Sequence, residues 1–147
     1  MLRRRFRGKT LSQQWQPLPP PDTPRTSCGV ASFANSIVLV GGKDANSNSL
    51  NSVEVYNFEL GSWHPLPALK IAKSRCTALV HRDKLYVFGG VDQSKHEKYL
   101  SKIEVLDLNR PQRGFRFLRH SMPLALSHVV AVSYTDKSLF FHRVLPY

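Results

Sequence analysis

The sequence repeats itself with a spacing of 48 residues, and this repeat limits the folds that the chain can adopt. Several pairs of residues share the spacing: Trp15 and Trp63, Leu18-Pro19 and Leu66-Pro67, Cys28 and Cys76, and Gly41-Gly42 and Gly89-Gly90. A period of this length is typical of proteins that stack copies of one small structural unit, such as solenoids and propellers. We therefore expect the chain to consist of consecutive copies of one unit.

Each copy contains four short segments with the composition of β-strands. The apolar runs are short and rich in β-branched residues, while ten prolines and eight glycines interrupt any helical periodicity. The expected strands cover residues 30–33, 37–40, 52–56 and a stretch around Trp63 in one copy, and residues 77–81, 85–88 and 102–107 in the next, where Phe115 or Phe117 takes the place of Trp63. Four short strands per unit, separated by turn residues, predict the blade of a β-propeller.

The residues around the double glycines resemble a known repeat family. The string Leu85-Tyr86-Val87-Phe88-Gly89-Gly90, and the earlier Val53-Glu54-Val55-Tyr56, Gly61-Ser62-Trp63 and Leu66-Pro67, are similar to kelch repeats, whose period is about 50 residues. The resemblance implies an all-β fold, a partial kelch β-propeller with four-stranded antiparallel blades. About two blades and part of a third are expected, with repeats over about 15–62 and 63–114 and an incomplete copy over 115–147.

The repeated residues have structural explanations. Glycines let the chain leave the second strand where a side chain would clash or where φ must be positive. Tryptophan and tyrosine offer large apolar faces for packing between blades. We therefore expect a set of scaffold positions, namely Trp15, Gly41, Gly42, Tyr56, Trp63, Gly89 and Gly90.

A closed propeller has 4–8 blades, which is more than this chain supplies. Residues 136–141 repeat the pattern of residues 83–87, but His142-Arg143 stand where the double glycine is due. The sequence therefore favours a fragment of a longer protein. Two alternatives stay open: several copies could complete one ring through their exposed blade faces, or the chain could complete itself on another protein.

The resemblance also implies a function. Many longer kelch proteins carry an N-terminal BTB domain and act as substrate adaptors of cullin-based ubiquitin ligases, and others bind actin. The predicted function is accordingly a protein-binding module of adaptor or scaffold type, with binding to actin or the cytoskeleton as the alternative. Residues 1–12 are not similar to a BTB domain; we expect them to form a basic leader without regular structure, ahead of a kelch domain over residues 13–147.

The loops after the second strands and the connections between blades should open on one face of the propeller, where a rigid scaffold presents its binding residues. Basic residues outnumber acidic ones in these loops, which suits an acidic peptide or protein surface. Arg75 is the foremost candidate, because it stands fourteen residues before Gly89, where the resemblance implies an arginine at the mouth of the central channel; Ser27 has this place in the earlier copy. The further candidates for partner binding are Arg25, Lys73, Lys95, His96 and Tyr99.

Other classes of function fit the sequence less well. The six histidines form no metal-spaced pair and no Ser-His-Asp order stands out, so we expect neither an enzyme nor a bound metal or cofactor. Two cysteines, Cys28 and Cys76, are too few for a disulfide framework, and no apolar run is long enough to span a membrane. The formal charge of +11 raises nucleic-acid binding as an alternative, but the aromatic residues occupy scaffold positions instead of alternating with basic ones.

The start of the chain leaves the compartment open. Five basic residues precede the first acidic one, Asp22: Arg3, Arg4, Arg5, Arg7 and Lys9. Such a stretch is typical of a mitochondrial transit peptide or of a basic arm for nucleic acid, and also of a leader with neither role. The cytoplasm is the default expectation for a chain with unpaired cysteines, with mitochondria and the nucleus open.

Overall fold

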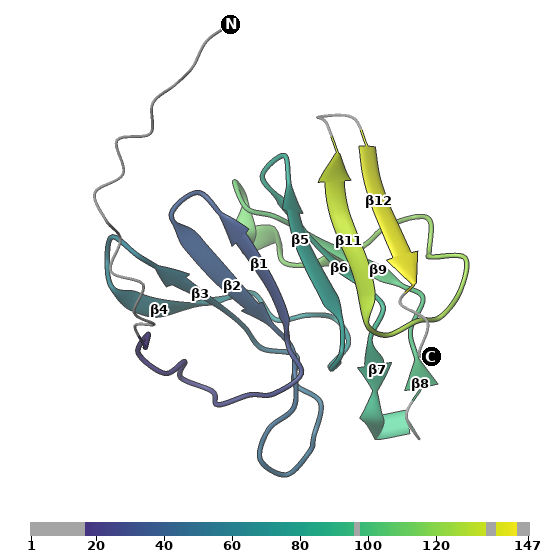
Figure 1. Cartoon of the computed structure of the whole chain (residues 1–147), viewed down its shortest axis with the longest axis horizontal. Helices are drawn as coiled ribbons and strands as arrows, with labels where there is room; N and C mark the ends of the chain where they lie inside the picture. The colour runs from purple at the N-terminus through teal and green to yellow at the C-terminus, as the bar shows by residue number, and fades with distance from the viewer. Residues whose placement is uncertain (1–16, 96–97, 135–137, 144–147) are drawn as a thin grey trace, which may run out of the picture.

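A computed structural model describes residues 17–95, 98–134 and 138–143 of the chain. The regular structure in these ranges is β-strand, apart from two short 3-10 turns (Figure 1). The expectation of an all-β fold is confirmed. Trp15 and His96, which the sequence singled out, lie outside the described residues.

Blade 1 is a four-stranded antiparallel sheet. Its strands are β1 (Gly29–Phe33), β2 (Ser36–Val40), β3 (Val53–Asn57) and β4 (Ser62–Leu66), and they follow one another across the sheet in this order. Each strand pairs with the next one along the chain, so the polypeptide runs up and down from β1 at one edge to β4 at the other. This is the predicted architecture of a propeller blade.

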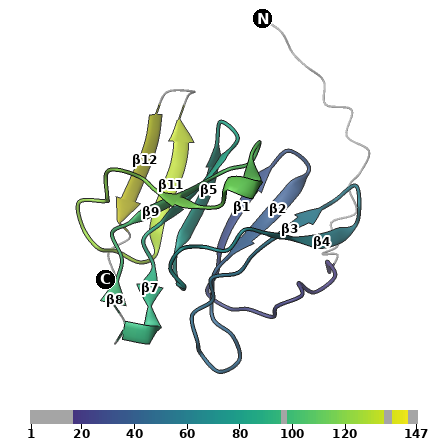
Figure 2. The same ribbon diagram turned by 180° about the vertical axis from the view of Figure 1, so that it is seen from behind.

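Blade 2 repeats the arrangement with β5 (Thr77–His81), β6 (Lys84–Phe88), β9 (Ile103–Asp107) and β10 (Arg116–Phe117). The loop between β6 and β9 carries a small hairpin of β7 (Val91–Asp92) and β8 (Lys98–Tyr99), with the 3-10 turn η1 (Gln93–Lys95) after β7. A second turn, η2 (Pro111–Arg113), precedes β10, and the chain after it crosses the back of blade 2 (Figure 2).

A third unit begins beside blade 2. The strands β11 (Val129–Tyr134) and β12 (Ser138–Arg143) pair as an antiparallel hairpin, which matches the first two strands of a blade. The first strands of the three units, β1, β5 and β11, lie side by side (Figure 1). The described residues thus hold two blades and part of a third, as the sequence predicts.

The hydrophobic core lies between the blades. One cluster joins blade 1 to blade 2, and its most deeply buried members are Val38, Val40, Val53, Leu85, Val87, Leu106 and Phe115. A second cluster joins blade 2 to β11 through Phe88, Ile103, Met122 and Val129. Because each cluster draws side chains from two neighbouring units, each unit depends on the next for its stability.

The register of blade 2 settles which phenylalanine takes the place of Trp63. In blade 1, Trp63 stands opposite Tyr56. In blade 2, Arg116 pairs with Val105, so the preceding residue, Phe115, comes opposite Leu106. The Phe115 side chain is almost completely buried, whereas Phe117 is 41% exposed. Phe115 is therefore the counterpart of Trp63, and Phe117 does not take that packing position.

The double glycines allow the segment that leads into the next blade to approach their backbone closely. Gly41 has φ +58° and Gly89 has φ +56°, in the left-handed region that favours glycine. A Cβ on Gly41 would lie 2.3 Å from the Lys73 carbonyl oxygen, and one on Gly89 would lie 2.2 Å from that of Leu126. The amides of Gly42 and Gly90 donate hydrogen bonds of 2.9 Å to the same two carbonyls. Each glycine pair thus holds the connection that leads into the following blade.

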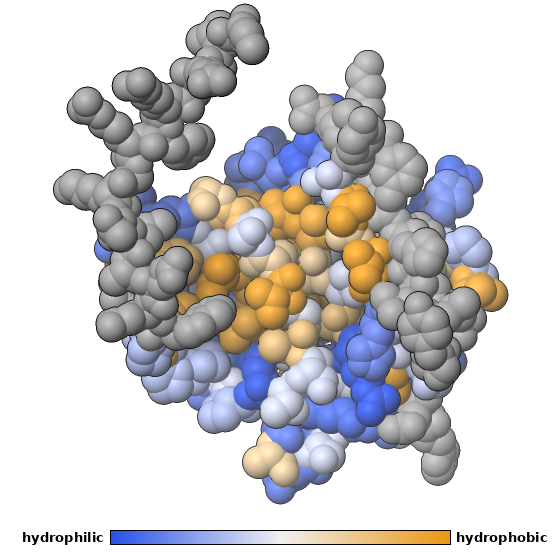
Figure 3. All heavy atoms as spheres, viewed as in Figure 1, coloured by the Kyte–Doolittle hydropathy of each residue, from blue (hydrophilic) through white to orange (hydrophobic). Residues whose placement is uncertain are grey.

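Apolar side chains also remain on the surface. Figure 3 shows them gathered over the face that β1, β5 and β11 form. The exposed valines of these strands are Val30 in β1 and Val130 and Val132 in β11. Val30 has the place in blade 1 that Ala78 has in blade 2. Ala78 is buried against blade 1. The exposure of Val30 therefore marks the side of blade 1 that blade 2 does not cover.

Candidate functional site

The loops expected to bind a partner lie together at one end of the blades. In blade 1, one row of paired residues runs across this end of the sheet: Gly29 pairs with Val40, Val40 with Val53, and Val53 with Leu66. This row joins the start of β1, the end of β2, the start of β3 and the end of β4. Blade 2 has the same arrangement. We call this end the loop face; it consists of residues 19–28, 41–52, 67–76, 89–95, 98–102 and 121–128.

Backbone hydrogen bonds tie the segments of the loop face to one another. Thr26 and Lys43 exchange bonds of 3.0 and 2.8 Å, and Ser74 and Val91 exchange bonds of 3.0 and 2.8 Å at the same place in the next unit. The Lys73 amide also donates to the Leu50 carbonyl at 3.0 Å. The loops are thus fixed to their neighbours by the same bonds in successive units, which gives the loop face a rigid frame.

Arg75 belongs to a row of three equivalent residues. Ser27 and Arg75 each stand two residues before the first strand of their unit, and His128 stands one residue before its strand. All three have a left-handed backbone, with φ of 53°, 53° and 52°. The Arg75 amide donates to the Ser27 carbonyl at 2.8 Å, and the His128 amide donates to the Arg75 carbonyl at 3.1 Å. Strained backbone of this kind in residues other than glycine is concentrated at functional sites.

His128 is a member of this row that the sequence did not reveal. The double glycine marks the place of Arg75 in its copy, whereas the third copy has no double glycine. The available signal was the apolar run at 129–132, which marks the first strand of the third unit. The side chains of Ser27 and His128 are exposed and that of Arg75 is half-buried, so the row presents a hydroxyl, a guanidinium and an imidazole.

Arg25 and Lys73 occupy equivalent places in successive units, and both are buried. The Arg25 guanidinium forms an ion pair with Glu54 of β3, and the Lys73 ammonium forms one with Glu104 of β9, at 2.7 Å. Their side chains are 1% and 0% exposed. Arg25 and Lys73, two of the residues predicted to bind a partner, are thus each enclosed with a carboxylate of their own blade.

These carboxylates also hold the connection between blades. A Glu54 oxygen accepts the Asp22 amide at 2.9 Å, and a Glu104 oxygen accepts the Lys70 amide at 2.6 Å. Arg25 additionally donates to the Gly41 and Ser52 carbonyls at 3.0 and 2.9 Å. A buried ion pair with such hydrogen bonds orders the loop face from beneath, instead of presenting a charge to a ligand.

The other predicted residues lie in the hairpin of blade 2. Tyr99 in β8 is exposed on the loop face. Lys95 ends η1, but its side chain lies outside the described atoms, as does all of His96. Of the six candidates, Arg75 and Tyr99 are therefore the two whose described side chains reach the surface of the loop face.

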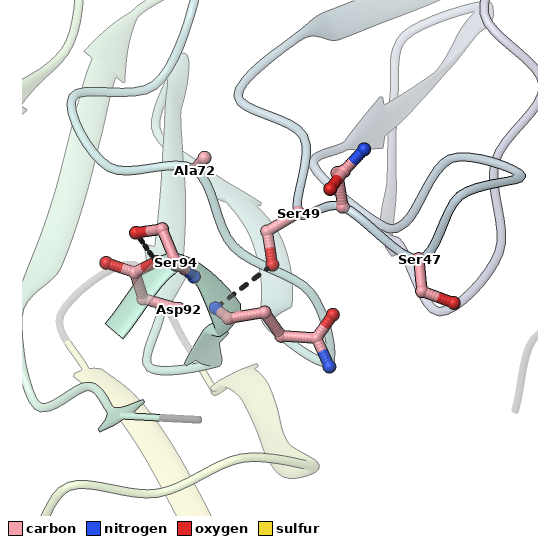
Figure 4. Close-up of a pocket in the computed structure, with 7 residues that line it drawn as sticks. Ser47, Ser49, Ala72, Asp92 and Ser94 are labelled. Carbon is pink, nitrogen blue, oxygen red and sulfur yellow. Dashed lines mark hydrogen bonds between the residues drawn. The ribbon is translucent and has the colours of Figure 1, made fainter. Parts of the chain in front are cut away.

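A hollow of about 480 Å³ opens between the loops of blades 1 and 2 (Figure 4). Its walls carry hydroxyl, amide and carboxylate groups; the lining residues are Ser47, Asn48, Ser49, Ala72, Asp92, Gln93 and Ser94. The Ser49 hydroxyl accepts a long bond of 3.4 Å from the Gln93 amide, which links the two walls, and an Asp92 oxygen accepts bonds of 3.0 and 2.6 Å from the Ser94 amide and hydroxyl. This lining can therefore both donate and accept hydrogen bonds.

The wall from blade 1 is shaped by Asp44. Its carboxylate accepts the amides of Asn46 and Asn48 at 2.9 and 2.8 Å and the Asn48 side-chain amide at 3.0 Å. These hydrogen bonds, those from Asn48 foremost, lower the pKa of Asp44 below its usual value. No motif in the sequence points to this serine- and asparagine-rich wall.

The two cysteines are unsuited to chemistry at this site. Both are free thiols, and Cys76 is buried among the strands of the first core cluster. Burial raises the pKa of the Cys76 thiol to about 11, and burial also raises that of Cys28, although the nearby Arg25 opposes it. Within the described residues, no group of three or more histidine, cysteine or acidic residues is placed to hold a metal ion. The same part of the chain contains no helix with the length and apolarity of a membrane span.

Two antiparallel blades packed face to face, each with a double glycine that holds the next, define a β-propeller of the kelch class. The kelch motif matches residues 24–70 and 72–110. The chain belongs to the kelch-repeat family. Kelch repeats serve as protein-interaction modules, generally without enzymatic activity.

Curated relatives share this part of the sequence. The chain is 31% identical to an F-box/kelch-repeat protein of Arabidopsis thaliana over 105 residues, which are 70% of the chain and 25% of that protein. It is 36% identical to kelch-like protein 40 of Mus musculus over 102 residues, 66% of the chain and 16% of that protein. Human kelch-like protein 33 is 31% identical over 85 residues, 58% of the chain and 16% of that protein. The match thus spans a quarter or less of each relative.

Proposed function

We propose that the chain is a protein-binding kelch module of adaptor or scaffold type, and that its loop face binds an acidic segment of a partner protein. The observation that carries the proposal is the row of Ser27, Arg75 and His128, three surface side chains on backbone fixed by hydrogen bonds. A guanidinium binds a carboxylate through two parallel hydrogen bonds, so Arg75 is the anchor of the proposed site. The hollow lined by Ser49 and Asp92 lies on the same face and would receive the flanking backbone.

The adaptor role is supported by the relatives. Their names join the kelch repeat to an F-box or place them among the kelch-like proteins. We propose that this chain supplies the partner-binding part of such an adaptor, for example one that brings a substrate to a ubiquitin ligase.

Binding of a fluorescent acidic peptide by the full chain tests the proposal. Hydrogen bonds to a charged group contribute about 1.5–3 kcal/mol, so Arg75→Ala should weaken binding by about tenfold or more. Arg82→Ala is the matched control, because Arg82 is an exposed arginine with a left-handed backbone at the opposite end of the same hairpin. Equal effects of the two substitutions, or no effect of Arg75→Ala, would remove the anchor from the proposal.

We further propose that the uncovered sides of the blades associate with another kelch blade. Val30 of blade 1 has the place of Ala78, which packs in the interface between the two blades. Val130 and Val132 are exposed on β11 of the third unit. The interface between blades 1 and 2 is the template for such contacts, and a second copy of the chain can supply them.

A further inference from the structure

The outer edge of blade 2 carries a run of basic residues that the loop face does not use. Between residues 110 and 120 the chain has four arginines and a histidine: Arg110, Arg113, Arg116, Arg119 and His120. Asp107 and Asp136 are the nearest acidic residues on either side. We call the five basic residues the arginine ridge. The ridge contributes much of the excess positive charge of this half of the chain.

The backbone of the ridge is held firmly while its charges face the solvent. Phe115 is 2% exposed in the core between the blades, and Leu118 packs against the second core cluster. All five basic side chains of the ridge are exposed. The salt bridges of the described residues join Arg25 to Glu54 and Lys73 to Glu104, so the ridge takes part in none of them.

Blade 1 shows that the fold does not require these arginines. Its corresponding outer segment is residues 58–68, aligned through Trp63 and Phe115. This segment forms the same edge strand, yet it contains no lysine or arginine and carries an acidic residue, Glu59. The aromatic anchor is therefore common to both blades, whereas the positive charge is confined to blade 2.

The ridge also has an apolar and a backbone component. Phe117 is exposed between Arg116 and Arg119. Because the Leu118 amide donates to the Ile103 carbonyl of β9 at 2.9 Å, the backbone groups of Phe117 point away from β9, toward the open edge of the sheet. An edge of this kind can accept an additional strand.

We propose that the arginine ridge is a second docking site, which binds an extended acidic segment of a partner protein. The guanidinium groups bind carboxylates of the segment, Phe117 contacts an apolar side chain, and the backbone groups of Phe117 pair with the added strand. An extended acidic peptide can use the guanidinium groups, the Phe117 ring and the Phe117 backbone groups. A nucleic acid can use the guanidinium groups and can stack on the Phe117 ring, but it does not pair with the backbone as a strand. This site is separate from the loop face and does not depend on the function proposed for Arg75.

The test uses the full chain with Arg75→Ala, so that the loop face does not contribute. The probes are a labelled peptide of aspartate and glutamate residues with one central phenylalanine, and a labelled single-stranded oligonucleotide. Replacing Arg110, Arg113, Arg116 and Arg119 by glutamine should weaken peptide binding at least about tenfold. The matched control removes the same charge from the loop face through Lys43→Gln, Lys70→Gln, Lys98→Gln and Lys102→Gln, and should weaken it less than about threefold.

Three results would overturn the proposal: equal losses in the two quadruple variants, tighter binding of the oligonucleotide than of the peptide, or no binding of the peptide before substitution. A variant with the same four arginines replaced by lysine keeps the charge and guards against a folding defect. It should bind more weakly than the parent but more tightly than the glutamine variant, because lysine cannot form the bidentate contact. Circular dichroism of each variant checks the β-structure.

Discussion

Lys73 and Glu104 face each other at the junction of blades 1 and 2, with both side chains completely buried and the ammonium 2.7 Å from a carboxylate oxygen. The ammonium makes this ion pair but donates no hydrogen bond of regular geometry to any described residue. Its counterpart Arg25 donates to three backbone carbonyls and to the Ser52 hydroxyl as well as to Glu54. The same junction is therefore built in two ways, and the lysine version is the less complete.

Removing one partner of the lysine pair should destabilise the chain strongly. Lys73→Met leaves the Glu104 carboxylate buried without its counter-ion, and such a change costs about 3–5 kcal/mol. Urea denaturation followed by circular dichroism measures the loss. Lys43→Met, at a partly exposed position on the same face, is the control and should change the free energy of unfolding by less than about 0.5 kcal/mol.

Replacing Lys73 by arginine should instead stabilise the chain. Arginine has five donors in place of three and can reach carbonyls at the end of β6 as Arg25 does at the end of β2, with a gain of about 1 kcal/mol. The same urea titration checks this. A fall in stability would show that the pocket around Lys73 is too tight for a guanidinium.

The double glycine should tolerate no side chain. Gly89→Ala combines an unfavourable φ of +56° with a Cβ only 2.2 Å from the Leu126 carbonyl, which would push the third unit away from blade 2. Gly114 has a similar φ of +69° but no atom within 4 Å of an added Cβ. Its ψ of 177° lies in a region that is nearly restricted to glycine, so Gly114→Ala should lose only the backbone cost of about 1–3 kcal/mol. Thermal unfolding of the two variants separates the steric effect from the conformational one. Similar losses in both would mean that the carbonyl contact is easily relieved.

The Cys76 thiol should make stability fall at alkaline pH. Its pKa is about 11 in the folded chain and 9.0 as the reference for an unfolded one, so the folded state retains its proton while the unfolded state loses it. Stability is therefore complete below pH 9 and decreases as the pH rises through 11, by up to about 2–3 kcal/mol. Cys76→Ala should flatten this part of the curve of unfolding free energy against pH. An unchanged slope would assign the alkaline loss to other groups.

Charge on the uncovered blade faces should reduce self-association. The double variant Val30→Lys and Val132→Lys places ammonium groups on the two outward sides, where a second copy would have to bury them. Light scattering after size-exclusion chromatography should show the average mass fall toward that of one chain. Leu124→Lys changes an exposed apolar residue of the loop face and should leave the mass unaltered. A parent chain that is already monomeric would remove the proposal of association.

Much of the fold could be predicted because its signals are local. The double glycines, the alternating strands and the turns between them recur in order, and the strands begin and end close to the expected residues. The choice between Phe115 and Phe117 could not be made from the sequence, since both are aromatic and two residues apart. It depends on the pairing of β10 with β9, which is a relation between strands.

The candidate site was harder to predict because burial is not a local property. Arg25 and Lys73 resemble the other basic residues of the loops, and what distinguishes them is a carboxylate from a later strand, 29 residues from Arg25 in the case of Glu54. The repeat held a clue, since a basic residue and a glutamate recur together in both copies. Among the described residues, Arg75 forms no ion pair with an acidic side chain, which agrees with its place near the surface.

The left-handed row of Ser27, Arg75 and His128 separates support from recognition. The backbone amides and carbonyls of these residues carry the links between units, so these links do not use the side chains. A different amino acid can occupy each of the three places while the frame stays the same. The chemical character of this surface can therefore be altered one unit at a time, by substituting one residue of the row while the backbone hydrogen bonds stay in place.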